Sequence, residues 1–104
     1  MSKVKLTDYV VEFLLKKGIH DFFGYQGTMI AHLVDSIEKN PHVRSHSSYH
    51  EQGAAFAACG YAQAKNACGC AYATSGPGAA NLLSGVADAY FDSLPVIFIT
   101  GQLN

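Results

Sequence analysis

The chain has 104 residues, a formal net charge of −1 and seven Lys and Arg residues, which form no basic run. This length suits one domain rather than two, and the scattered charge excludes the basic surfaces typical of proteins that bind nucleic acids or anionic membranes. The longest apolar stretches are interrupted well before they could cross a bilayer, so we also exclude a membrane span.

Charged residues are scarce in this chain. They make up 14% of the sequence, compared with roughly a quarter in ordinary globular domains, and apolar residues make up 49%. A domain this small exposes much of its surface, so we expect other domains or subunits to cover part of it. Residues 1–104 are therefore expected to form a single domain, or part of one, within something larger.

The cysteines and histidines give no sign of a metal site. Cys59, Cys68 and Cys70 lack the CxxC spacing of redox and zinc sites, and no N-terminal segment resembles a signal peptide. His46 and His50 are four residues apart, but the segment between them reads as extended, so they do not share a helical face. We expect reduced thiols, no metal ligands and a cytoplasmic location.

The elements predicted first in the chain are a helix, a strand and a second helix. Thr7 can cap a helix that ends at Gly18, and residues 19–23 form a short apolar run. Apolar residues then recur at helical spacing from Met29 until Asn40 and Pro41 end the pattern.

The rest of the chain alternates in the same way. The predicted elements are an extended segment at 43–49, a helix at 51–65, a strand at 70–74, a loop at 75–78, a helix at 79–91 and a strand at 95–100. The last strand is almost continuously apolar, which predicts burial on both faces. Together the elements predict an α/β fold, a mainly parallel, doubly wound sheet with helices on both faces.

The helix at 51–65 is rich in Ala and Gly, so its backbone can approach a neighbour closely. We expect it at a subunit interface. The alternative is that its alanines pack against the sheet of their own domain.

Unusual residues follow three of the strands, at 24–27, 50–52 and 74–78. In such sheets, ligands bind at the carboxyl ends of the strands. The segments that follow in the second half of the chain are His50-Glu51-Gln52-Gly53-Ala54-Ala55, Gly60-Tyr61-Ala62, Thr74-Ser75-Gly76-Pro77-Gly78, Asn81, Asp92-Ser93 and Ile99-Thr100-Gly101-Gln102. Their order and spacing resemble the N-terminal, pyrimidine-binding domain of the thiamin diphosphate enzymes represented by acetolactate synthase.

The resemblance implies a catalytic role for Glu51. A carboxyl group at a strand end, at the mouth of an apolar helix, can be held largely away from water, as suits a group that exchanges protons. In the family this glutamate bonds ring nitrogen N1′ of the cofactor and promotes the imino tautomer that removes the thiazolium C2 proton. From the isolated residue, a carboxylate that is merely stabilised by a helix N-terminus remains an alternative.

The resemblance also implies which other residues bind the cofactor and the substrate. Tyr25, Gly27, Pro77 and Asn81 join Glu51 as residues that bind thiamin diphosphate. Gln26 and Thr28 lie in a turn whose sequence in the synthases is usually Tyr-Pro-Gly-Gly, and which in the family faces the reacting thiazolium. Here Gln26 replaces the proline and Thr28 replaces the second glycine. Those two side chains are expected to reshape the substrate pocket, which leaves the 2-oxo acid and the product open.

Part of the family's active site is expected to lie outside this sequence. The family holds the cofactor's diphosphate through Mg²⁺ on a later domain with a Gly-Asp-Gly motif, and no such motif occurs here. We therefore expect activity to require the remaining domains of the polypeptide and a second identical subunit, and these residues alone to be inactive. Three alternatives remain open: another thiamin diphosphate-dependent decarboxylase or lyase, a non-catalytic α/β interaction module, or a nucleotide-binding domain. The nucleotide-binding alternative lacks a P-loop lysine and a GxGxxG pattern.

Overall fold

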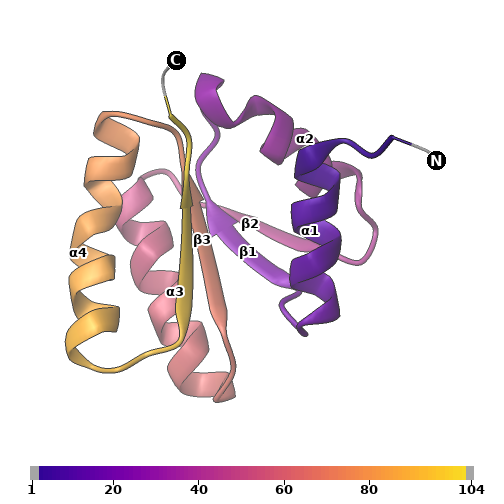
Figure 1. Ribbon diagram of the computed structural model, residues 1–104. Helices are drawn as coiled ribbons and strands as arrows, with labels where there is room; N and C mark the ends of the chain where they lie inside the picture. Colours follow the sequence, from indigo (N-terminus) through magenta and orange to yellow (C-terminus); the bar gives the residue numbers. More distant parts are fainter. Residues whose placement is uncertain (1–2, 103–104) are drawn as a thin grey trace.

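Two pairs of helices enclose a four-stranded sheet in the computed structural model, which describes residues 3–102 (Figure 1). The elements in chain order are α1 (Leu6–Lys16), β1 (Asp21–Gly24), the 3₁₀ helix η1 (Thr28–Ile30), α2 (Ala31–Lys39), β2 (Arg44–Ser47), α3 (Glu51–Lys65), β3 (Gly69–Ala73), α4 (Pro77–Phe91) and β4 (Val96–Thr100). No helix within these residues is both long and apolar enough to cross a membrane.

The sheet is parallel throughout, with strand order β2-β1-β3-β4. Helices α1 and α2 cover one face, and α3 and α4 cover the other (Figure 1). The chain leaves β1 towards one edge of the sheet and leaves β3 towards the other, and right-handed crossovers in opposite directions put their helices on opposite faces. The predicted doubly wound α/β fold is confirmed.

The face under α1 and α2 carries the larger apolar side chains. Phe22 of β1 and Tyr72 of β3 point into it and are almost fully buried. The helices cover them with buried Val11, Leu14, Leu33 and Ile37. The alternation of side chains along a strand sends the next residue, Phe23, to the opposite face.

The face under α3 and α4 is built from small residues. Ala55 and Ala58 of α3 are fully buried against the sheet and α4. A methyl group at Gly85 of α4 would lie 2.3 Å from the Cβ atom of Ala55, and one at Gly69 would lie 2.4 Å from the carbonyl oxygen of Ala58. These small residues therefore allow close packing inside the domain, which is what we expected as the alternative to a subunit interface. The outward face of α3 exposes Phe56, and its expected place at a subunit interface stays a prediction.

Two details of the sequence prediction are wrong. Thr7 does not cap α1, which begins at Leu6; its hydroxyl donates instead to the carbonyl oxygen of His32 in α2 at 3.1 Å. Strand β4 is not buried on both faces, because the side chains of Ile97 and Thr100 are exposed. It is an edge strand, and no strand pairs with its outer side within residues 3–102. The strand that is buried along its whole length is β3, which lies between β1 and β4.

An ion cluster ties edge strand β2 to β1. The Asp21 carboxylate, 6% exposed, accepts hydrogen bonds from Arg44 Nε at 2.9 Å and Nη2 at 2.8 Å. His46 Nε2 lies 2.9 Å from the same carboxylate, and its ring stacks on Phe23 at a centroid distance of 4.6 Å. The Arg44 guanidinium, with His46 beside it, holds the pKa of Asp21 far below its usual value.

The first prediction concerns the approach of α3 to α4. Gly85→Ala should lower the free energy of unfolding by about 1–3 kcal/mol, because the added methyl group collides with Ala55 in a packed layer. Gly53→Ala is the matched control: a methyl group there meets nothing within 4 Å, so the change should stabilise the helix by about 0.5–1 kcal/mol. Urea unfolding measures both, and equal effects of the two changes would contradict the packing described.

The second prediction concerns acid stability. Because the pKa of Asp21 is lowered by folding, its contribution is fully present above its ordinary pKa of 3.8 and is lost as the pH falls below that value. Asp21→Asn should therefore destabilise the protein by about 1–3 kcal/mol at pH 7 and flatten the loss of stability below pH 4. Asp35→Asn removes a carboxylate whose pKa is also lowered but whose ion pairs are exposed and screened by solvent, so it should change the acid limb of the unfolding curve much less than Asp21→Asn does.

Candidate functional site

The carboxyl ends of β1 and β3 lie side by side, where the chain leaves in opposite directions. In a doubly wound sheet, a crevice opens at such a point because the two following segments diverge to opposite faces. The turn after β1 carries Tyr25, Gln26 and Gly27, and the turn after β3 carries Ser75 and Gly76. The predicted site segments at these two strand ends therefore lie next to each other, at the place where this rule expects a crevice.

Glu51 and Asn81 are joined directly. Glu51 is the first residue of α3, Asn81 lies in the second turn of α4, and the Asn81 Nδ2 atom donates to Glu51 Oε1 at 3.0 Å. Both side chains are half-buried. One turn further along α4, the Gln52 amide donates to the Ser84 hydroxyl at 3.0 Å. These two contacts fix the beginning of α3 against α4.

Thr74 connects the two sides of the crevice. Its hydroxyl accepts a hydrogen bond from the backbone N–H of Met29 at 3.2 Å. A methyl group at Gly27 would lie 2.5 Å from Thr74 Cβ, and one at Gly78 would lie 2.8 Å from Thr74 Cγ2 and 3.4 Å from Glu51 Oε2. Glycine is thus required at both positions for the turns to close around Thr74 and Glu51. The sequence analysis placed Thr74 in a motif but assigned it no role. The signal that could have identified it is its position directly after the buried strand β3.

The remaining predicted cofactor-binding residues are more exposed. Pro77 occupies the first turn of α4, where proline is well suited, and it faces solvent. Tyr25 is 41% exposed. The Glu51 side chain is half-buried, and its expected shielding from water in the complete site stays a prediction.

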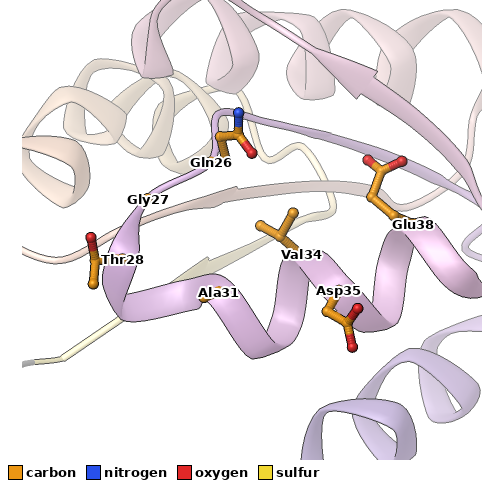
Figure 2. Close-up of a pocket in the computed structure, with 7 residues that line it drawn as sticks. All are labelled: Gln26, Gly27, Thr28, Ala31, Val34, Asp35 and Glu38. Carbon is orange, nitrogen blue, oxygen red and sulfur yellow. The ribbon is translucent and has the colours of Figure 1, made fainter.

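Gln26 and Thr28, the predicted substrate residues, line an open groove of about 610 Å³ along α2 (Figure 2). Ala31 and Val34 give it an apolar floor, and Glu38 lies at its far end. Neither Glu51 nor Asn81 lines it. The groove and the Glu51–Asn81 pair therefore occupy different places.

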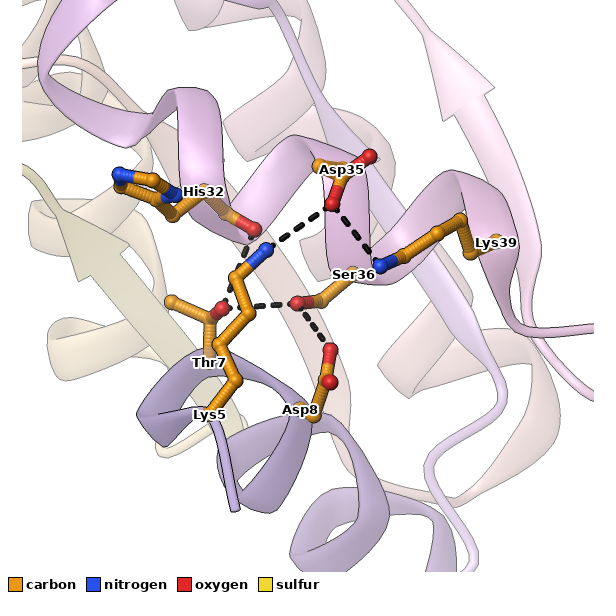
Figure 3. A network of polar contacts seen from close by, with 7 residues as sticks. All are labelled: Lys5, Thr7, Asp8, His32, Asp35, Ser36 and Lys39. Carbon is orange, nitrogen blue, oxygen red and sulfur yellow. Dashed lines mark hydrogen bonds and ion pairs between the residues drawn. The ribbon is translucent and has the colours of Figure 1, made fainter. Parts of the chain in front are cut away.

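Asp35, beside this groove, belongs to a polar network between α1 and α2 (Figure 3). Lys5 and Lys39 lie 2.9 and 3.0 Å from its carboxylate and lower its pKa. Ser36 completes the network by donating to Asp8 at 2.5 Å and contacting the Thr7 hydroxyl at 2.7 Å. This network joins two helices and leaves the charge of Asp35 balanced.

Metal-binding and thiol chemistry are not indicated in the part of the chain that the structure describes. No group of three or more His, Cys, Asp or Glu side chains there could hold a metal ion. Burial raises the pKa of Cys70 to about 12, so this thiol stays protonated and serves packing.

The amino-acid sequence is similar to those of a known enzyme family. Residues 4–104 match the family described as "Thiamine pyrophosphate enzyme, N-terminal TPP binding domain". The chain belongs to this family. It is 46% identical over 102 residues to the probable acetolactate synthase 2, chloroplastic, of Oryza sativa subsp. japonica. It is 44% identical over 99 residues to acetolactate synthase 1, chloroplastic, of Zea mays, and 42% identical over 99 residues to acetolactate synthase, chloroplastic, of Arabidopsis thaliana.

These matches cover almost all of this chain and a small part of each relative. The alignments span 98%, 95% and 95% of the chain and 15%, 16% and 15% of the three synthases in the same order. The resemblance predicted from the motifs of the sequence, to the N-terminal domain of thiamin diphosphate enzymes and to acetolactate synthase, is confirmed.

The third prediction concerns the Glu51–Asn81 contact. Asn81→Asp replaces a hydrogen-bond donor with a second carboxylate, so it should lower the free energy of unfolding by about 1–3 kcal/mol at pH 7. The loss should shrink at pH 4–5, because protonation of one carboxyl group restores a donor.

Ser84→Asp is the matched control for this change. It introduces the same charge one turn along α4, where the partner is the Gln52 amide, which can donate to a carboxylate. Urea unfolding at both pH values measures the effect. A loss for Asn81→Asp that does not depend on pH would show that the two side chains are not in contact.

Proposed function

We propose that this chain binds and activates the aminopyrimidine ring of thiamin diphosphate within an acetolactate synthase-like enzyme that acts on 2-oxo acids. The observation that carries the proposal is the Glu51 carboxylate, bonded by Asn81 next to Gly78, in a chain of the thiamine pyrophosphate enzyme family. The proposed activity is decarboxylation or carboligation of 2-oxo acids.

The residues at the crevice suit an aminopyrimidine. Asn81 bonds Glu51 Oε1, and within residues 3–102 no side chain is bonded to Oε2, so this oxygen can accept a hydrogen bond from a ligand nitrogen. Gly27 and Gly78 keep the surrounding turns free of side chains. Tyr25 and Pro77 offer exposed ring surfaces on the two turns. A flat heterocycle with ring and exocyclic nitrogens matches this combination of a carboxylate, glycine turns and apolar rings.

Each of these residues has a separate task in the proposed function. Thiamin diphosphate, when bound, supplies the carbanion chemistry that a protein side chain cannot supply. Glu51 holds and releases a proton at its carboxylate, and the Asn81 amide keeps one oxygen of that carboxylate fixed. Tyr25, Gly27 and Pro77 orient the ring. Gln26 and Thr28, on the turn after β1, are proposed to contact the 2-oxo acid and select among such acids.

The remaining parts of the site belong to the proposal as well. The half-exposed Glu51 side chain fits a site whose enclosure is completed by other domains and by a second identical subunit. Mg²⁺ and the diphosphate are proposed to bind on a later domain of the same polypeptide. A cytoplasmic location remains a prediction.

A second candidate function is another thiamin diphosphate-dependent decarboxylase or lyase. Gln26 and Thr28 favour it, since they place larger or more polar side chains where the synthases usually carry Pro and Gly. A non-catalytic interaction module is less well supported, because such a module has no need of a carboxylate held by an amide at the crevice.

The fourth prediction concerns the cofactor proton. Glu51→Gln in the full-length protein should retain thiamin diphosphate and slow exchange of its C2 proton roughly 100-fold or more, because an amide cannot carry the proton. Exchange followed by NMR measures the rate. Glu12→Gln, the same change on the outer surface of α1, should leave the rate within about twofold of the original. An unchanged rate in Glu51→Gln would exclude Glu51 from the mechanism and refute the proposed function.

A further inference from the structure

The residue before Glu51 holds the first turn of α3. His50 has extended backbone angles, with φ −152° and ψ 141°, and its carbonyl oxygen accepts the first helical bond, from Ala54 N at 3.2 Å. Its Nδ1 atom lies 3.0 Å from the backbone nitrogen of Gln52. These are the features of an N-cap residue, although histidine is not among the residues that usually occupy this position.

The hydrogen bond from the Gln52 backbone N–H determines which ring nitrogen of His50 carries the proton. A backbone N–H can only donate, so Nδ1 must be the acceptor, and the ring proton then resides on Nε2. His50 is therefore neutral in this arrangement. The acceptor is three bonds from Cα, the same separation as the side-chain oxygen of asparagine, which is one of the preferred N-cap residues.

The N-cap of α3 differs from those of the other helices in the described part of the chain. Among the helices of residues 3–102, α3 is the one whose N-cap side chain bonds a backbone N–H. Its sequence includes Gly53 in the first turn and Gly60 in the interior, both unfavourable for a helix. Glu51 is its first residue, so fraying of this turn would release the carboxylate that Asn81 bonds.

The structure assigns to His50 the role of a positioning residue: its neutral imidazole caps α3 through Nδ1 and thereby directs the Glu51 carboxylate towards Asn81. The assignment deepens the proposed function and rests on it for the consequence at the cofactor. The capping itself concerns the protein without the cofactor and is measured separately.

Three substitutions in the full-length protein separate the possible roles of the imidazole. His50→Asn keeps an acceptor at the position of Nδ1, His50→Gln moves the acceptor one bond outward towards the position of Nε2, and His50→Ala removes it. The first readout is amide hydrogen exchange of the protein without cofactor, followed by mass spectrometry on peptides covering residues 48–56. The second is C2-proton exchange of bound thiamin diphosphate by NMR.

His50→Ala should speed amide exchange in the first turn roughly fivefold, as expected for the loss of one cap, and slow C2-proton exchange, while His50→Asn restores both to within about twofold. Unchanged amide exchange in His50→Ala would overturn the capping role. Rescue by Gln and not by Asn would overturn it as well, since the important atom would then be Nε2. Restored amide exchange in His50→Asn with C2-proton exchange still slow would overturn the positioning role, because the imidazole would then act on the cofactor directly. The proposed function fails on a different result, an unchanged C2-proton exchange rate in Glu51→Gln.

Discussion

The approach of α3 to α4 at Ala55 and Gly85 is the contact on which the candidate site depends. A single added methyl group at Gly85 would force the two helices apart. Separation there would also pull Glu51 away from Asn81, because the hydrogen bond between them is made one turn before the close contact. Small residues in this layer thus fix a distance between helices, and that distance places a carboxylate within reach of an amide. A larger side chain on either helix would keep the fold and lose the contact.

A second constraint is that the chain leaves β1 and β3 towards opposite edges of the sheet. It places two turns next to each other that are about fifty residues apart in the sequence, and Thr74 fills the space between them. The two sheet faces also differ in character. Bulky side chains such as Phe22 and Tyr72 fill the face under α1 and α2, whereas alanines line the face under α3 and α4. The first face holds the largest fully buried side chains of the sheet, and the second allows α3 and α4 to approach each other closely.

Exposed apolar side chains remain on the outer surfaces of several helices. Tyr90 and Phe91 at the end of α4 are 78% and 80% exposed and contact each other edge to face. Leu83 and Phe56 are also exposed on α4 and α3. The scarcity of charge noted in the sequence is thus matched by exposed apolar side chains on the outer faces of these helices.

The sequence by itself determined the alternation of helices and strands, the parallel α/β fold and the residues that follow each strand, because these depend on periodicity and on turn residues close together in the chain. It also singled out Glu51 and Asn81 as candidate site residues through their motif. It did not determine their mutual contact, the capping role of His50 or the position of Thr74 between two glycines. The exposure of β4 and the inward direction of the α3 alanines were likewise settled by the tertiary structure. These features depend on strand order and on contacts between distant segments, and no local pattern encodes which strand lies at an edge or which helix face meets a neighbour.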